Sequence, residues 1–212
     1  MNDRMDIPEE KAPAPKKQKK PVLSAKGKAL FWEIYDLLEV VASVTIVVML
    51  GFAFLGRLNI VEGESMDKTL AEGQYLLISD LFYEPTPGDI VVVHDITAAP
   101  YNDPIVKRVI AVGGQTVEID FSTWTLKVDG EVVEEPYRYL DVGYCTLRAE
   151  YGIDRDGIFR LTVPENEVFV LGDNRNNSGD SRQKEIGTVD KRCVVGKACL
   201  RLFPLSEFGI PD

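Results

Sequence analysis

A serine and a lysine are the residues of this sequence whose types point most directly to chemistry. The single histidine, His94, follows the apolar run 90–93 and is predicted to lie in a strand, so a histidine-based catalytic triad is not expected. A serine activated by a lysine is a recognised alternative among nucleophilic enzymes. Ser65 is the candidate nucleophile and Lys107 the candidate base.

A lysine that takes a proton from a serine must itself be neutral, and its reference pKa is about 10.4. Burial among apolar groups lowers the pKa of a lysine because it disfavours the charged form. Lys107 has apolar neighbours at 104–106 and at 109–110. The alternative is an edge-strand lysine whose side chain reaches outward into solvent. Lys68 follows Asp67 in a polar setting and is expected to stay charged.

A second polar segment, 172–182, follows the apolar run 168–171 and reads GDNRNNSGDSR. Taken alone, this segment predicts a loop. Its alternative is a solvated hairpin whose side chains hydrogen-bond only one another.

Three cysteines, Cys145, Cys193 and Cys199, are too few for a disulfide scaffold. If Cys193 and Cys199 share a strand, they lie roughly 20 Å apart and cannot bond to each other. Together with the single histidine, these cysteines suggest no metal site, and no cofactor is expected.

The elements that must position these residues are predicted to be mainly β. No stretch of ten or more residues beyond position 57 shows sustained helical periodicity, whereas several short runs are rich in β-branched residues. Glycine-containing turns of the kind that join antiparallel strands separate these runs. The predicted strands are 75–78, 89–93, 106–112, 116–119, 125–128, 168–171 and 193–202, and the turns are 86–88, 113–114, 129–130 and 156–157.

An apolar segment at 40–56 holds 17 residues without a charge. As a helix it spans roughly 25 Å, which nearly matches a hydrocarbon core of about 30 Å. Trp32 and Tyr35 precede it, where an aromatic belt would lie. It predicts an uncleaved membrane anchor. A buried helix of a soluble domain is disfavoured because such helices are rarely apolar on every face. A cleaved signal peptide is disfavoured because its usual size is exceeded and because a small-residue cleavage site such as 51–53 would fall inside the apolar run.

Charge is unevenly distributed along the 212 residues, whose net charge is −10. Residues 1–29 hold eight basic and four acidic side chains as well as four prolines, and predict a disordered basic tail. The positive-inside rule places this tail in the cytoplasm and residues 58–212 outside. The acidic remainder argues against nucleic-acid binding, which usually needs a basic face.

Five motifs that follow the anchor in order resemble the bacterial type I signal peptidase family, over nearly all of residues 30–205. They are G-E-S-M-x-x-T-L at 63–70, G-D-I-V-V-V at 88–93, V-K-R-V-I at 106–110, G-D-N-R-x-x-S-x-D-S-R at 172–182 and G-K-A at 196–198. The resemblance implies a mainly β fold, in which a single N-terminal transmembrane helix precedes an antiparallel β catalytic core with a smaller inserted β subdomain.

The implied division places a cytoplasmic tail at 1–29 and an anchor helix at 30–57. The catalytic core would occupy 58–116 and 166–212, and the inserted subdomain 117–165.

The same resemblance assigns roles to individual side chains. It makes Ser65 the nucleophile and Lys107 the general base. Ser178 would hydrogen-bond the base, while Asp180 and Arg182 would form an ion pair that holds the loop.

Two further residues would complete the site. Met66 would line it. The oxyanion hole would use the Ser65 N–H and a second donor from position 63, which is serine in some members and Gly63 here.

Two positions depart from the family pattern: Lys68 stands where proline is usual, and Gln115 where aspartate is usual. Lys68 also creates a Ser-x-x-Lys sequence with Ser65, as in penicillin-binding proteins and β-lactamases. Those enzymes also need S-D-N and K-T-G elements, and neither tripeptide occurs in this sequence.

The implied activity is cofactor-free removal of N-terminal signal peptides from exported preproteins at the bacterial cell membrane. The implied partners are preproteins emerging from the export machinery and membrane lipids, not nucleic acid. The cleavage segment would bind as an extended strand, with alanine-like side chains at the first and third positions before the scissile bond. Two alternatives are an inactive membrane-anchored β module that binds export substrates, and a Ser-Lys self-cleaving repressor-type protease, which the anchor and the acidic outer domain disfavour.

Overall fold

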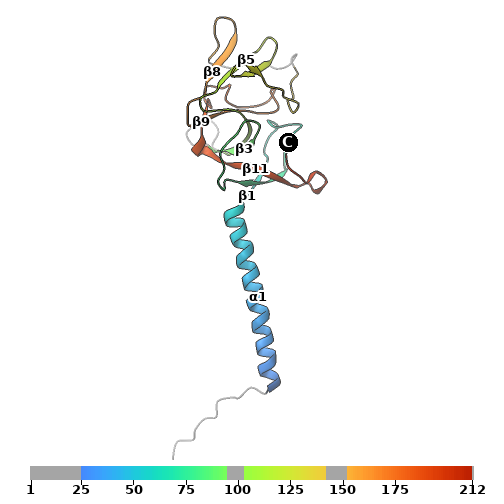
Figure 1. Ribbon diagram of the computed structural model, residues 1–212. Coiled ribbons are helices and arrows are strands. Elements are labelled where there is room, and N and C mark those ends of the chain that lie inside the picture. Colours follow the sequence, from blue (N-terminus) through green and yellow to red (C-terminus); the bar gives the residue numbers. More distant parts are fainter. Residues whose placement is uncertain (1–24, 95–102, 142–151, 212) are drawn as a thin grey trace, which may run out of the picture. The chain divides into compact units, whose positions relative to one another are not determined.

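The computed structural model describes residues 25–94, 103–141 and 152–211. The chain divides into two compact units, of which one ends at Val47 and the other begins at Val48. One long helix, α1 (Ala25–Leu55), contains the described part of the first unit, and the second unit consists mainly of β-strands that follow the end of this helix (Figure 1). The prediction of a mainly β fold after one N-terminal apolar helix is therefore confirmed.

Helix α1 begins five residues before the expected anchor range and ends two residues before Arg57. Gly56 breaks it at a point where a β-carbon would stand 2.8 Å from the carbonyl oxygen of Ile78. Within the helix, the hydroxyls of Ser43 and Thr45 donate to carbonyl oxygens one turn earlier, so both are satisfied without water. Residues 26–51 are long and apolar enough to cross a membrane.

A seven-stranded antiparallel sheet forms most of the second unit. Its strand order is β1-β2-β11-β3-β4-β9-β10, so that β4 has a neighbour on each side. The strands are β1 (Arg57–Ile60), β2 (Tyr75–Ser79), β3 (Ile90–Val93), β4 (Ile105–Val112), β9 (Glu167–Leu171), β10 (Val189–Asp190) and β11 (Val194–Phe203).

A four-stranded antiparallel sheet, in the order β7-β6-β5-β8, comes from the chain between β4 and β9. Its strands are β5 (Thr116–Asp120), β6 (Thr125–Val128), β7 (Glu131–Val132) and β8 (Ile158–Thr162), and two short 3₁₀ helices, Lys191–Cys193 and Leu205–Glu207, lie outside both sheets. The β6–β7 turn uses Asp129 and Gly130, both with positive φ, as a two-residue antiparallel hairpin requires.

Apolar packing covers both faces of the seven-stranded sheet. Along β3, Ile90 and Val92 belong to one buried cluster, and Val91 and Val93 to another, as the alternation of a strand requires. A third cluster joins the two sheets, because Phe169 of β9 packs in the same core as residues of β5, β6 and β8. The second unit is thus held by continuous apolar contacts.

All seven predicted strands are present, and four further strands, β1, β7, β8 and β10, were not predicted. The prediction that His94 lies in a strand is wrong. His94 lies one residue beyond β3, and its backbone N–H donates to the Cys193 carbonyl oxygen. The ladder between β3 and β4 ends at Val93, so the strand does not reach His94. Cys193 lies in a 3₁₀ helix before β11 and Cys199 lies within β11, so the two cysteines do not share a strand. Cys145 lies outside the described residues.

Candidate active site

Ser65 and Lys107 lie in contact, with 2.7 Å between the serine Oγ and the lysine Nζ. Lys107 is held on β4, where it lies opposite Val91 of β3. Ser65 lies in the turn between β1 and β2, which Met66 and Leu70 fix by burying their side chains. The 42-residue separation in sequence is therefore closed by packing of this turn against the sheet.

The Lys107 side chain is buried, with only 3% of the residue exposed. Burial lowers the pKa of Lys107 to about 8; the Arg182 charge acts in the same direction, and the Asp180 and Asp173 carboxylates oppose it. One N–H of the amine donates to the Val106 carbonyl oxygen at 3.0 Å. The remaining lone pair of a neutral Lys107 can then accept the Ser65 proton.

A cleft of about 460 Å³ opens over the Ser65–Lys107 pair. Residues 62–64 form one wall and residues 103–106 another, and Asn177 and Gly179 also line the cleft. An extended segment of peptide can therefore reach Ser65 between two stretches of backbone.

Residues 172–177 hold the main chain around Ser65. The Asn174 N–H donates to the Ser65 carbonyl oxygen at 3.0 Å, and its side-chain amide donates to the Glu64 carbonyl oxygen at 2.9 Å. The Asn177 amide donates to the Glu64 carboxylate at 3.1 Å. Segment 172–182 is therefore bound to the nucleophile turn and is not the solvated hairpin of the alternative interpretation.

Asp180 and Arg182 form the expected ion pair, with Nε–Oδ1 at 2.8 Å and Nη2–Oδ2 at 2.9 Å. Both side chains are fully or almost fully buried. Burial alone would raise the pKa of Asp180, but the Arg182 guanidinium and the N–H of Gly172 hold that pKa below its ordinary value. The carboxylate is thus charged next to Lys107.

Ser178 and Met66 do not make the contacts expected of them. The Ser178 hydroxyl is buried without a hydrogen-bond partner, so the expected bond to Lys107 is not formed, although the hydroxyl is near enough to help keep Asp180 ionised. Met66 is 1% exposed and packs in the core beneath the turn rather than lining the cleft. Gly63 does line the cleft, in a left-handed conformation with φ of 78°.

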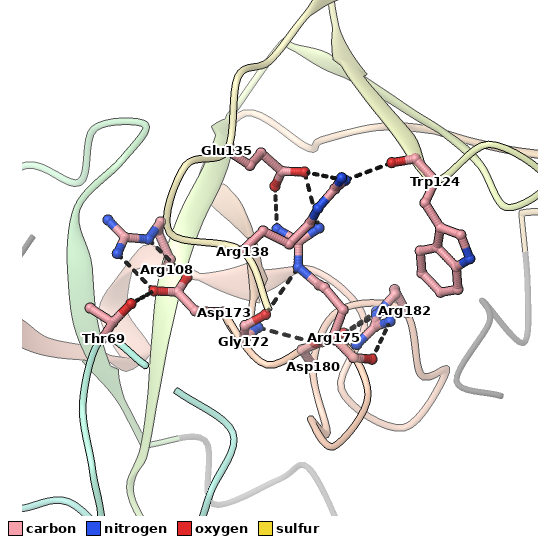
Figure 2. A network of polar contacts seen from close by, with 10 residues as sticks. All are labelled: Thr69, Arg108, Trp124, Glu135, Arg138, Gly172, Asp173, Arg175, Asp180 and Arg182. Carbon is pink, nitrogen blue, oxygen red and sulfur yellow. Dashed lines mark hydrogen bonds and ion pairs between the residues drawn. The ribbon is translucent and has the colours of Figure 1, made fainter. Parts of the chain in front are cut away.

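The site also contains four charged residues to which the sequence analysis assigned no role (Figure 2). They are Arg108, Asp173, Arg175 and Glu135. Arg108, next to Lys107 on β4, forms a two-pronged ion pair with Asp173 at 2.7 and 2.9 Å, and Asp173 also accepts from the Thr69 hydroxyl at 2.6 Å. The second pair joins Arg175 to Glu135. Arg108 could have been found, since a charge inside the apolar run 105–112 needs a buried partner.

The two departures from the family pattern are accommodated locally. Lys68 has φ of 75°, a conformation closed to proline, and its Nζ lies 4.2 Å from the centre of the Tyr139 ring. The Gln115 side chain accepts from the Val112 N–H and donates to Asp129, so it stabilises the turn after β4.

Among the described residues, no group of three or more His, Cys, Asp or Glu side chains is placed to hold a metal ion.

Comparison with known proteins gives matches over most of the chain. A family model described as signal peptidase, peptidase S26, matches residues 34–203. Signal peptidase IB of Staphylococcus aureus is 34% identical over 190 residues, covering 82% of this chain and 93% of the relative. The probable signal peptidase I-1 of a Synechocystis species is 32% identical over 164 residues, covering 74% of this chain and 76% of the relative.

Among solved structures, a crystal structure of a signal peptidase I from Enterococcus faecalis is 30% identical. The match covers 54% of this chain and 97% of that chain, with a TM-score of 0.41.

Proposed function

Because the chain belongs to the signal peptidase family, peptidase S26, we propose that Ser65 is its catalytic nucleophile and Lys107 its general base. The chain is a membrane-bound serine endopeptidase that removes signal peptides. The observation that carries the proposed roles is the 2.7 Å contact between the serine Oγ and a buried lysine amine with a lowered pKa.

The reaction proceeds in two stages. Lys107 takes the hydroxyl proton as Ser65 Oγ attacks the scissile carbonyl carbon, and the protonated amine then gives that proton to the leaving amino group as the peptide bond breaks. The acyl-enzyme on Ser65 is attacked by water, whose proton passes to Lys107. The tetrahedral intermediate formed by this attack then collapses. The bond to Ser65 Oγ breaks, the signal peptide leaves with a new carboxyl end, and Lys107 returns the proton to Ser65.

The cleft suits a substrate in extended conformation. Its two walls, 62–64 and 103–106, are stretches of main chain that can pair with a peptide as strand edges do. Small side chains at the first and third positions before the scissile bond would let the peptide lie close to both walls. The Ser65 N–H is one proposed donor to the oxyanion, and the main chain at Gly63 is the proposed source of the second.

Supporting roles fall to the 172–182 loop. Asp180 and Arg182 hold the loop, and their buried charges also act on the pKa of Lys107 in opposite directions. Ser178 is proposed to orient the Lys107 amine during the reaction by a rotation of its hydroxyl. Met66 supports the nucleophile turn from below.

The proposed arrangement of the chain keeps the basic tail in the cytoplasm and residues 58–212 outside, in contact with exported preproteins and membrane lipids. The four-stranded sheet is the proposed inserted subdomain, and the seven-stranded sheet the catalytic core. Protease added outside intact cells whose wall has been removed should degrade the β-strand unit and spare the tail; digestion of the tail alone would contradict this orientation.

A serine-reactive acyl probe tests the dyad and separates an enzyme from an inactive binding module. The wild-type protein in membranes should be labelled and should cleave a preprotein, and Ser65→Ala should do neither. Folded wild-type protein without labelling or cleavage would favour the binding module.

A further inference from the structure

We propose that Glu135 is a positioning residue for proteolysis, because it fixes Arg175 and, through Arg175, the segment 172–177 that holds the main chain of Ser65. This inference rests on the proposed function of Ser65 and Lys107. Glu135 lies on the chain just after β7, and no step of the reaction described above uses it.

The Glu135 carboxylate is buried, with 2% of its side chain exposed, and it binds two arginines (Figure 2). Arg175, whose side chain is 3% exposed, contacts both carboxylate oxygens. Arg138 donates to Glu135 at 3.1 Å and to the carbonyl oxygen of Trp124 at 2.7 Å. Trp124 belongs to the core that joins the two sheets, so Glu135 is anchored to the four-stranded sheet through Arg138.

Arg175 passes this constraint to the catalytic loop. Its Nε donates to the Gly172 carbonyl oxygen at 3.0 Å, and its own carbonyl oxygen accepts from Arg182 at 3.2 Å. The main chains also pair: the Tyr139 N–H donates to the Asp173 carbonyl oxygen at 2.8 Å, and the Arg175 N–H donates to the Tyr139 carbonyl oxygen at 2.9 Å. Segment 135–139 therefore lies against segment 172–175 and holds it through both side-chain and main-chain hydrogen bonds.

The last link runs from this loop to the nucleophile. Asn174 makes two hydrogen bonds to the main chain at Glu64 and Ser65. The orientation of the peptide around Ser65 sets the direction of both its Oγ and its N–H. A displacement of about 1 Å at such a site can lower the reaction rate by about a hundredfold.

A buried ion pair is weak support for stability, because desolvation of the charges offsets much of their attraction. A position that served stability alone could be filled by apolar groups of similar volume. The two arginines that meet at Glu135 lead to different places: Arg138 to the four-stranded sheet, and Arg175 to the loop that binds Ser65. This placement suits a group that fixes geometry between the sheet and the site.

The test compares Glu135→Gln with Glu134→Gln in the full chain, purified in detergent. Glu134 is the exposed neighbour, so its variant removes the same charge outside the ion pair. With a signal-peptide cleavage substrate, we expect Glu135→Gln to lower kcat at least tenfold and to change KM less than twofold, with Glu134→Gln equal to the wild type. Labelling by the serine-reactive probe should slow in the same proportion, and Glu135→Asp should recover part of the rate.

A purely structural role would lower the melting temperature and leave the kcat of the folded fraction unchanged, and that result would overturn the inference. So would a change in KM alone. If Glu135→Gln does not fold, Arg175→Lys, which keeps the charge and loses the two-pronged contact, must show the same loss of kcat. A wild-type protein that neither cleaves nor is labelled would instead refute the proposed function, whereas wild-type cleavage with an equally active Glu135→Gln would refute this inference alone.

Discussion

The main chain of Gly172 lies against the carbonyl oxygen of Ser65, so closely that a β-carbon at position 172 would stand 2.5 Å from that oxygen. The same β-carbon would stand 2.2 Å from the Ser178 hydroxyl. The absence of a side chain at the first residue of the G-D-N-R motif thus allows the loop to reach the nucleophile turn.

Gly172→Ala is therefore expected to displace the loop from Ser65. Overpacking of this kind typically costs about 1–3 kcal/mol of stability. We expect a lower melting temperature together with a loss of cleavage of at least about tenfold in the folded protein, measured by thermal unfolding and peptide turnover. Full turnover in a folded Gly172→Ala protein would show that the loop does not fix the nucleophile.

Lys107 and Lys68 both lie near Ser65 in sequence or in space, and their variants should differ sharply. Lys107→Met keeps much of the side-chain volume and removes the base, so we expect a folded protein whose turnover falls at least about a hundredfold. Lys68→Ala loses only the contact with the Tyr139 ring, which is worth about 0.5–1 kcal/mol at an exposed site, and should change turnover less than threefold.

Steady-state cleavage of one peptide by both variants and the wild type decides this comparison. Lost turnover in Lys68→Ala with retained turnover in Lys107→Met would overturn the assignment of the base.

The pH dependence of cleavage should report the Lys107 amine, whose pKa lies at about 8. Only the neutral form accepts the Ser65 proton, so kcat/KM should rise about tenfold per pH unit below 8 and level off above it. Initial rates from pH 5 to 10 test this, with Lys68→Ala expected to follow the wild-type curve. A flat profile through pH 8 would contradict a lysine base.

The same amine links stability to pH. Between about pH 8 and 10.5 the unfolded chain keeps the Lys107 proton that the folded protein has lost, so the folded state gains stability as the pH rises through this window. The full gain is roughly 3–4 kcal/mol, at about 1.4 kcal/mol per unit of pKa shift. Lys107→Met should lack this gain, which appears as the difference between the two urea-unfolding curves across the window.

Ser178→Ala and Arg182→Met should differ sharply in their effects on stability. The Ser178 hydroxyl is buried without a hydrogen-bond partner and only helps to keep Asp180 ionised, so its removal should leave the unfolding free energy nearly unchanged and lower turnover by only about two- to tenfold. Arg182→Met leaves Asp180 charged and buried, which typically costs about 3–5 kcal/mol, and should abolish most activity. Urea unfolding and peptide turnover measure both effects; a Ser178→Ala protein that unfolds far more readily would contradict this description of the hydroxyl.

The sequence predicted those residues of the site that can be recognised from their neighbours in the chain. Lys107 was found from its apolar neighbours, and Ser65, Asp180 and Arg182 from motifs whose spacing is short. Ser178 and Met66 were assigned contacts by resemblance, and the structure gives them others, because the orientation of one hydroxyl and the depth of one side chain depend on packing that no motif specifies.

Glu135 escaped prediction for a different reason. It stands next to Glu134 in a polar stretch, and only the tertiary fold brings it to Arg175, 40 residues later. The strands that were missed show the same limit: β1 and β7 are only four and two residues long and mostly exposed, so only their pairing with β2 and β6 defines them.

The last prediction concerns β1, which connects the membrane helix to the nucleophile turn. All four of its residues pair with β2, and Val61 continues this pairing through hydrogen bonds with Gln74 and Gly73. A chain that begins at Gly56 keeps the whole strand, whereas one that begins at Val61 removes it, so that the turn that carries Ser65 loses the four paired residues that precede it.

We therefore expect the chain that begins at Gly56 to fold and to cleave short peptides in detergent, but to cleave membrane-bound preproteins more slowly than the full chain, because the anchor raises the local concentration of two membrane-bound reactants. The chain that begins at Val61 should melt at a lower temperature and lose peptide cleavage as well. Circular dichroism melting and peptide turnover of both chains provide the measurement. If the longer chain is folded and inert in detergent, the anchor takes part in shaping the site; if the shorter chain is fully active, β1 does not position Ser65.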